Sequence, residues 1–217
     1  MFASAAAVTP SASAATVTQI SIPNVAITSM NTVKIKAGLH YYDPSGSYSW
    51  VIKTSTNVSD YSTSSLGWID WSVYIGWGLY ADWYPGINPL GTYHAYPDTS
   101  STNSGPENTA TFYVRLGSKL SISAVRSGQY VTIGAHAGYY NDNLDGYYGR
   151  GGWTDWRGRA VAIQVWTGKA WTTVKTLTTN SRGMASLKIS SASARSWRVT
   201  DGSTSLIWGA TSATVRK

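Results

Sequence analysis

Hydrophobic and polar residues alternate over short stretches of this chain, and turn residues separate the stretches. The first stretch places Ile20 and Ile22 before Pro23, and Val25 and Ile27 after it. Alternation of this kind is typical of β-strands with one buried face. Because proline lacks a backbone donor, this strand is predicted to lie at the edge of a sheet.

Similar stretches, bounded by Gly, Pro, Asp or Ser, continue along the whole chain. In the first half they lie at residues 32–42, 47–56, 67–77, 91–98 and 110–118. In the second half they lie at residues 119–125, 129–140, 158–166, 170–180, 183–189, 196–202 and 208–215. No stretch keeps a 3.6-residue period over a helix length, and residues 190–196 could form one helical turn at most. Short strands at this spacing predict β-sandwiches.

The strand pattern restarts after Gly117, which predicts two domains, at residues 16–117 and 118–217. Residues 1–15 are rich in small side chains and end in an A-x-A pattern. This segment is predicted to be the tail of a signal peptide whose start lies upstream, with a disordered N-terminus as the alternative. The predicted location of the protein is therefore extracellular.

The charge differs between the two predicted domains. Residues 16–118 contain four basic and six acidic residues, a balance of −2, whereas residues 119–217 contain 13 basic and four acidic residues, a balance of +9. Such asymmetry suggests two modules with different surfaces or partners.

No run approaches the roughly 18 apolar residues of a membrane-spanning helix. The absence of cysteine excludes disulfides, thiol nucleophiles and thiolate metal sites.

Two regions resemble known modules. Residues 84–98 resemble the corner and penultimate strand of an immunoglobulin-like fold, with Tyr93 two residues before Ala95, where an antibody domain carries its second cysteine. Residues 158–189, which begin GRAVAIQVW, resemble immunoglobulin-like modules of secreted actinobacterial proteins, and residues 112–133 resemble the join between tandem modules. In the second half Trp197 stands where a corner tyrosine is expected, so its ring is predicted to pack there instead.

This resemblance implies an all-β fold of two tandem immunoglobulin-like β-sandwich domains. It implies little about function, because many unrelated secreted proteins carry such modules.

The sequence contains no convincing catalytic site. No carboxylate or hydroxyl stands at triad spacing from any of the three histidines, His40, His94 and His136. Three aspartates beside tryptophans are the best glycosidase candidates, although roles in turns or at the surface are the alternative: Asp70, Asp82 and Asp155. Phosphate-binding loops, HExxH and GxSxG are absent. The chain is predicted to be non-enzymatic and to need no cofactor.

One loop has the opening spacing of a calcium site, with Asn141, Asn143 and Asp145. Its twelfth position is Gly152 instead of the glutamate that binds calcium in a bidentate manner, and Arg150 adds repulsion. A hydrated Asx turn is therefore expected, and no metal site is predicted.

Aromatic residues provide the strongest indication of a binding surface. Trp and Tyr crowd into residues 68–84 and again into a Gly-rich stretch around residues 139–157 that is predicted to be a long loop. Loops on rigid strands commonly carry recognition, and Trp and Tyr are frequent anchors at interfaces. The predicted partner-binding residues of this loop are Tyr139, Tyr140, Tyr147, Tyr148, Trp153, Trp156 and Arg157. The alternative is that these rings fold back and cover the core.

The N-terminal stretch is the second predicted partner-binding region, through Ile20, Ile22 and Val25. Its backbone groups would need to pair either with the first domain or with the sheet edge of a neighbour.

These features predict a secreted, non-catalytic adaptor that binds other secreted proteins, for example in a toxin particle or a surface assembly. The alternative is a carbohydrate or cell-wall binding module in which Trp and Tyr rings stack on sugars. A third hypothesis is that the basic second domain binds nucleic acid or another anionic polymer. Export of the chain argues against a nucleic-acid partner.

Overall fold

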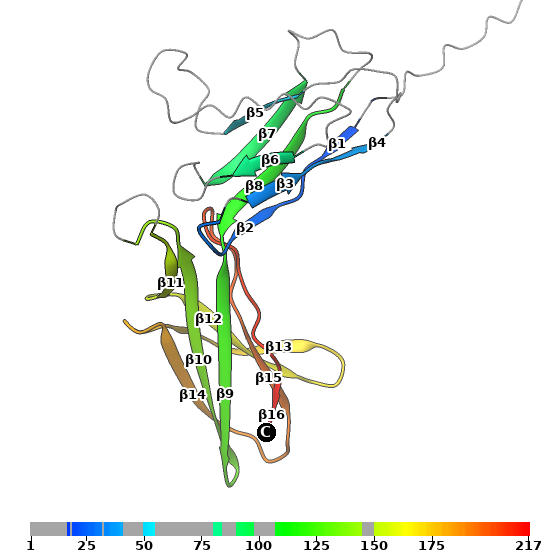
Figure 1. Cartoon of the computed structure of the whole chain (residues 1–217). Helices are drawn as coiled ribbons and strands as arrows, with labels where there is room; N and C mark the ends of the chain where they lie inside the picture. The colour runs from blue at the N-terminus through cyan, green and yellow to red at the C-terminus, as the bar shows by residue number, and fades with distance from the viewer. Residues whose placement is uncertain are drawn as a thin grey trace, which may run out of the picture.

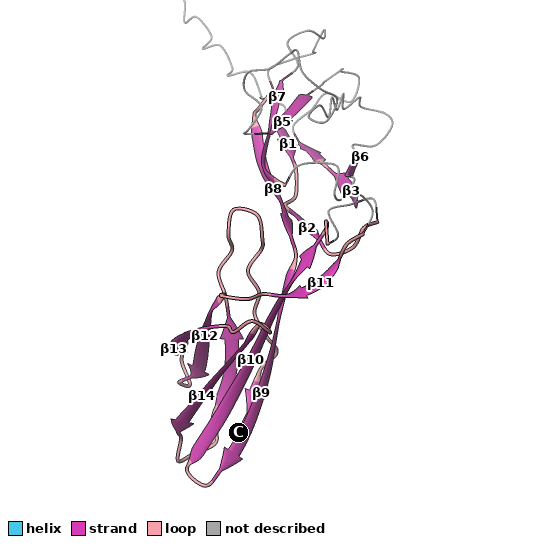
Figure 2. Cartoon of the chain, turned by 90° about the vertical axis from the view of Figure 1, so that its left-hand side faces the viewer, coloured by secondary structure: helices cyan, strands magenta, loops and turns pink. Residues whose placement is uncertain are grey.

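The computed structural model describes residues 17, 19–31, 33–40, 50–54, 80–83, 90–97, 107–144 and 150–217. Within these ranges the chain consists of strands and loops without any helix (Figures 1 and 2). It follows that these ranges also hold no apolar helix of the length needed to cross a bilayer. The stretch predicted to be a strand at residues 67–77 lies outside the described residues.

The described strands of the first half form one four-stranded sheet and two strand pairs. They are β1 (Gln19–Ser21), β2 (Val25–Ile27), β3 (Val33–Lys36), β4 (Gly38–His40), β5 (Trp50–Thr54), β6 (Tyr80–Trp83), β7 (Gly91–Pro97) and β8 (Ala110–Leu116). The sheet has the order β2-β8-β7-β5, while β1 pairs with β4 and β3 pairs with β6. Only Ala37 separates β3 from β4, so the two pairs follow one another along the chain.

The second half contains two four-stranded sheets. Its strands are β9 (Ser118–Ser127), β10 (Tyr130–Asn141), β11 (Gly152–Asp155), β12 (Ala160–Trp166), β13 (Trp171–Thr178), β14 (Met184–Ser190), β15 (Ser196–Thr200) and β16 (Val215–Arg216). The first sheet contains β9, β10, β11 and β14, with β10 in its centre, and Figure 2 shows β14, β10 and β9 side by side. The second sheet has the order β13-β12-β15-β16.

Both halves have the strand pairing of an immunoglobulin-like sandwich, in which strands A, B and E share one sheet and C, F and G share the other. In the first half β1, β3 with β4, and β6 correspond to A, B and E, and β5, β7 and β8 correspond to C, F and G. In the second half β9, β10 and β14 correspond to A, B and E, and β12, β15 and β16 to C, F and G, with β13 added beside β12. The prediction of two tandem immunoglobulin-like sandwiches is confirmed.

Pro23 marks the point at which the first strand changes sheets. Before it, β1 pairs antiparallel with β4, and after it β2 pairs in parallel with β8, with Val25 opposite Val114. Both pieces lie at sheet edges, as the proline predicted. The sequence did not predict that the two pieces belong to different sheets.

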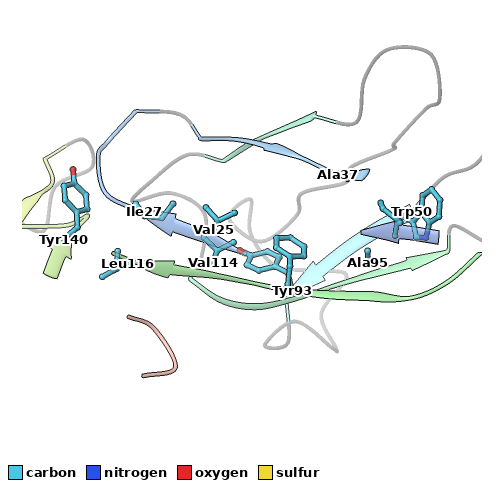
Figure 3. Close-up of a cluster of buried hydrophobic side chains, with 11 residues drawn as sticks. Val25, Ile27, Ala37, Trp50, Tyr93, Ala95, Val114, Leu116 and Tyr140 are labelled. Atoms are coloured by element: carbon cyan, nitrogen blue, oxygen red, sulfur yellow. The ribbon is translucent and has the colours of Figure 1, made fainter. Parts of the chain in front are cut away.

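The core of the first half lies between its two layers (Figure 3). Trp50, on the strand that corresponds to C, is fully buried, and its Nε1 donates a hydrogen bond to the Asn108 carbonyl at 2.9 Å. Tyr93 stacks on Phe112 with their ring centroids 5.2 Å apart, and Ala95 is buried beside them. A buried tryptophan on strand C and a tyrosine early in strand F are both hallmarks of immunoglobulin domains.

Burial of Tyr93 predicts a loss of stability in alkaline solution. Because burial raises the pKa of the Tyr93 phenol, the folded protein keeps this proton at a pH where the unfolded chain releases it. The unfolded phenol ionises near pH 10, so the contribution of this group is fully present below about pH 10 and falls as pH rises further. Melting temperatures measured between pH 8 and pH 12 should decline above pH 10, and Tyr93→Phe should make the decline shallower. An equally steep decline in the variant would contradict this assignment.

The second core cluster fills the space between the two sheets of the second half. Val131 and Ile133 of β10 face Val161 and Ile163 of β12, and all four are fully buried. Trp197 of β15 is buried in the same cluster, so the prediction that its ring packs inside is confirmed.

Gly117 joins the two halves. Its amide donates to the Ile27 carbonyl at 2.7 Å, and its carbonyl accepts from the Tyr140 amide at 2.8 Å. A Cβ atom on Gly117 would lie 2.5 Å from Thr28 Cγ2, so a side chain does not fit unless Thr28 shifts. The connection at Gly117 is therefore hydrogen-bonded to both halves.

A loop from the second half, residues 201–214, also reaches the first half. Leu116 donates its amide to the Leu206 carbonyl and accepts from the Trp208 amide, each at 2.9 Å. The Trp208 indole donates to the Val25 carbonyl at 2.7 Å, and Arg115 stacks over the Trp208 ring. Much of the strand predicted at residues 208–215 is thus a docking loop, and only Val215 and Arg216 form β16.

Candidate binding face

Three of the predicted binding rings pack against the cores, one buried and two half-buried. Tyr140 is buried in the first core cluster, next to Leu116 in Figure 3, and Tyr139 packs against the same cluster. Trp156 packs against the second cluster, and its ring lies 5.6 Å from that of Tyr139. Burial, together with the nearby charge of Asp142, raises the pKa of the Tyr140 phenol. These rings connect the two cores.

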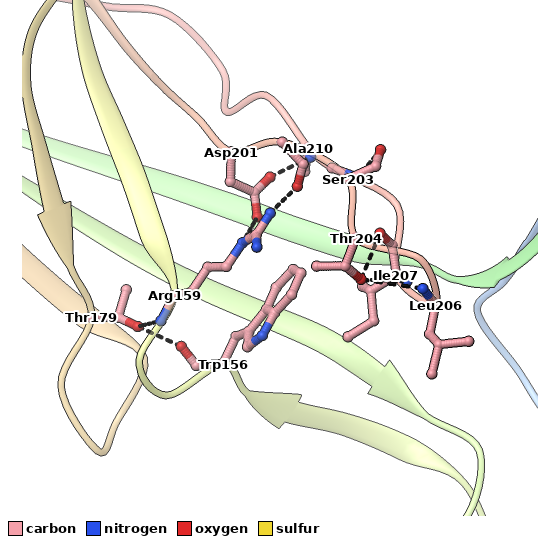
Figure 4. Close-up of polar contacts among 11 residues, drawn as sticks. Trp156, Arg159, Thr179, Asp201, Ser203, Thr204, Leu206, Ile207 and Ala210 are labelled. Carbon is pink, nitrogen blue, oxygen red and sulfur yellow. Dashed lines mark hydrogen bonds and ion pairs between the residues drawn. The ribbon is translucent and has the colours of Figure 1, made fainter.

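A polar network holds Trp156 in place (Figure 4). The Arg159 guanidinium lies 4.1 Å above the Trp156 ring, and its Nε donates to Asp201 Oδ2 at 3.0 Å. Arg159 Nη2 also donates to the Gly202 carbonyl. The other carboxylate oxygen, Asp201 Oδ1, accepts from the Ala210 amide at 2.5 Å. The Asp201 side chain is fully buried, so this ion pair fixes both Trp156 and the docking loop.

The predicted long loop is in part a strand pair. Tyr139 and Tyr140 belong to β10, and Trp153 belongs to β11, which pairs with it so that Tyr140 lies opposite Trp153. Their rings meet edge to face at 5.8 Å, a favourable cross-strand arrangement that accounts for the extra strand. Arg157 is exposed just after β11. Tyr147 and Tyr148 lie outside the described residues.

The N-terminal residues predicted to bind a partner pair within the chain. Ile20 and Val25 are buried in the first core, and Ile22 is half-buried. The backbone groups of β1 and β2 pair with β4 and β8, respectively. The sequence left open whether this stretch pairs with the first domain or with the sheet edge of a neighbour. In the structure it pairs with the first domain.

Trp153 remains exposed, with 41% of its surface accessible. The Lys119 Nζ lies 4.3 Å above its ring, and both side chains stand on the outer surface of the first sheet of the second half. In a strand alternate residues share a face, so the even-numbered residues of β10 from Tyr130 to Gly138 stand on the same surface.

A groove crosses this surface at Gly134. The partners of Gly134 across the sheet are Ser123 on β9 and Ser186 on β14. Because Gly134 has no side chain and both neighbours are small, the surface is hollow at this row, with a volume of about 370 Å³. A Cβ atom on Gly134 would lie 2.6 Å from Ser123 Oγ, so the serine hydroxyl forms the floor.

Large apolar side chains are exposed on the same sheet surface as the groove. Val125, Met184 and Tyr130 are 66%, 51% and 40% exposed. Val125 and Met184 occupy the rows on either side of Gly134, and Lys188 caps the Tyr130 ring at 4.9 Å. We refer to Val125, Tyr130, His136, Trp153 and Met184 as the groove face.

His136 lies in the row between Ser121 and Met184, and its Nε2 is 2.8 Å from Asp155 Oδ1. The sequence did not predict this pair, because the two residues are 19 positions apart on different strands. Among the described residues no hydroxyl lies within hydrogen-bond distance of His136, so the pair does not extend to a triad. Asn141 accepts from the Asn143 amide at 3.0 Å, which is the expected Asx turn.

Val125, Tyr130 and Met184 were not predicted as site residues, although the sequence carries a signal for them. In residues 118–127 the inward positions are Leu120, Ile122 and Ala124, which places Val125 out of phase with the buried set. Tyr130 and Met184 are out of phase in the same way at the starts of β10 and β14. A large apolar residue on the polar side of an alternating strand indicates an exposed contact surface.

No family model matches the sequence, and no curated protein matches it. Among solved structures, the chain is similar to the D00-D0 domain of intimin, at 14% identity and a TM-score of 0.30, over 92% of this chain and 98% of that one. It is similar to the human OSCAR ligand-binding domain at 12% identity and a TM-score of 0.30, over 91% and 96% of the two chains. It is also similar to the BSP domain of a biofilm associated protein, at 12% identity and a TM-score of 0.25, over 91% of this chain and 29% of that one.

Proposed function

We propose that this chain is a secreted, non-catalytic adaptor that binds another extracellular protein through the groove face. The observation that carries the proposal is that Val125 and Met184 flank the groove and that Tyr130 and Trp153 are exposed farther along the same sheet surface. Soluble proteins seldom leave several large apolar side chains together on one face unless that face binds something.

The composition of the groove face suits a protein partner. Tyr, Trp and Met are enriched at the centres of protein interfaces, where a few such anchors carry most of the binding energy. The serine floor and the His136–Asp155 pair supply hydrogen-bonding groups that fix the orientation of a partner. Trp153 and Arg157, both predicted from the sequence, stay in this proposal as exposed contact residues.

The extracellular setting is part of the same proposal. It is supported by the small-residue segment at residues 1–15 and by the resemblance to secreted actinobacterial modules. We also propose that residues 16–117 and 118–217 are separate domains, which the two core clusters support. In a toxin particle or surface complex, the first domain would act as a spacer and the second domain would bind the partner.

Capture experiments test this proposal. Immobilised full-length protein is incubated with the secreted fraction of the producing cells, and bound proteins are quantified by mass spectrometry. We expect Val125→Ser combined with Met184→Ser to weaken capture of a specific protein by at least about 30-fold, since even one interface anchor contributes about 2 kcal/mol and the variant removes two. Tyr96→Ser, which removes an exposed ring from β7 in the other half, is the matched control and should leave capture unchanged.

Two outcomes would overturn the proposal: no protein bound by the wild type, or a bound set that is the same for the wild type and the double variant. Both substituted side chains are exposed, so the variant should fold, and circular dichroism checks that it does.

A further inference from the structure

We propose that the outer surface of the other sheet of the second half, β13-β12-β15-β16, binds an acidic polysaccharide. Trp166 and Trp171 stand opposite each other across β12 and β13, with ring centroids 5.5 Å apart and planes tilted by 56°. Trp166 is 39% exposed. We refer to Trp166, Trp171, Gln164, Thr173 and Arg198 as the tryptophan face.

The hairpin that connects the two strands keeps the indole pair in position. Thr167 and Ala170 are joined by two backbone-directed hydrogen bonds at 3.0 Å and a third at 3.2 Å. Gly168 has a φ of 93°, which permits the tight turn between them. The aromatic pair is therefore formed before any ligand arrives, which lowers the entropy cost of binding.

Arg198 is held beside this pair in a fixed orientation. Its Nε donates to Gln164 Oε1 at 2.8 Å, and its guanidinium lies 4.4 Å above the Trp171 ring. Gln164 Nε2 in turn donates to Thr173 Oγ1 at 3.2 Å. In the part of the chain that the structure describes, the two terminal amino groups of Arg198 contact no acceptor. A guanidinium fixed at Nε and open at its end suits bidentate binding of a carboxylate.

The surroundings of the face are positive. Lys169, Lys175, Arg198 and Arg216 belong to this sheet or to its hairpin, and residues 156–217 contain a single acidic residue, Asp201. Asp201 is buried and paired with Arg159, so it does not offset the charge at the tryptophan face. A field of one sign attracts an anionic polymer and holds it near the surface.

The combination of an exposed tryptophan ring with an arginine fits an acidic sugar better than it fits another kind of polyanion. A tryptophan ring packs against the apolar face of a pyranose, and a uronate carries its carboxylate directly on such a ring. Arg198 lies one row from Trp166 on the diagonal, about 7–8 Å away, so neighbouring units of one polymer reach both. The next row, with Thr176, Ala162 and Thr200, is small and hydroxyl-bearing and leaves a flat path for the chain.

Affinity electrophoresis and calorimetry of the full chain with polygalacturonate test this inference. We expect binding that is at least tenfold tighter than to methyl-esterified polygalacturonate or to neutral dextran. Trp166→Ala and Arg198→Gln should each weaken binding at least tenfold. Arg198→Lys keeps the positive charge but lacks the paired N–H donors of a guanidinium, so it should also weaken binding. Tyr130→Ala on the groove face is the control and should leave binding unchanged.

Several results would overturn the inference: no binding to polygalacturonate or alginate, equal binding by Arg198→Lys, or unaltered binding by Trp166→Ala. Equal or tighter binding of polyglutamate or single-stranded DNA would assign the face to an acidic protein or a nucleic acid instead. Trp166 is exposed, so its variant should keep the wild-type melting temperature. Failure here leaves the groove face proposal untouched, because the two tests use different surfaces.

Discussion

Asp201→Ala is expected to lower the free energy of unfolding of the second half by about 3–5 kcal/mol. The reason is that the Arg159 side chain is largely buried and would lose the carboxylate that neutralises its charge. The substitution also removes the acceptor for the Ala210 amide. The loop that carries Leu206 and Trp208 to Leu116 would then lose its anchor. We therefore expect a lower melting temperature together with weaker coupling between the two halves.

Urea unfolding followed by tryptophan fluorescence measures the effect. The matched control is Asp155→Ala, which breaks an ion pair with His136 whose two side chains are 36% and 50% exposed. Exposed pairs contribute no more than about 1 kcal/mol, so the control should be almost as stable as the wild type. If the two variants lose the same free energy, the buried pair does not hold the loop as described.

Trp50→Ala is expected to destabilise the first half by about 3–5 kcal/mol, the usual cost of truncating a fully buried aromatic side chain. Two terms add here. The variant leaves a cavity in the first core cluster, and it removes the indole donor from the Asn108 carbonyl. Asn108 also bonds the backbone of Ile20 through its side chain, so the edge strand β1 should loosen as well.

Hydrogen exchange resolves this prediction by region. Amides of β1, β7 and β8 should exchange faster in Trp50→Ala, while those of β12 and β15 should keep their protection. Tyr96→Ala, an exposed ring on β7, is the control and should change little. Uniform acceleration across both halves would mean that the two sandwiches unfold as one unit.

Local patterns predicted much of the fold because they report which side of a strand is buried. Val161, Ile163 and Val165 alternate with polar or small residues, and all three are core residues of β12. Pro23 correctly indicated an edge strand, since a missing donor has the same consequence in any sheet. The change of sheet at Pro23 depends on where β4 and β8 lie, and the residues that pair with β2 on β8 are 89 positions away in the sequence.

The site was harder to predict because exposure of an aromatic ring is decided by distant partners. Trp153 and Trp156 are three residues apart, yet only Trp153 is exposed. Trp156 is covered because Arg159 is held over it by Asp201, 42 positions later in the sequence. No periodicity within residues 139–157 carries that information.

The parallel pairing of β2 with β8 has a mechanical consequence. A tensile load applied between the segment before β2 and the second half pulls the two strands in opposite directions along their length. Their hydrogen bonds then share the load in shear, whereas the bonds of a hairpin pulled at its open end break one after another. The Gly117 amide to Ile27 and the Trp208 indole to Val25 add two bonds beside the same strands. Under tension the paired strands β2 and β8 are therefore expected to resist extension, so the second half stays at a fixed distance from β2.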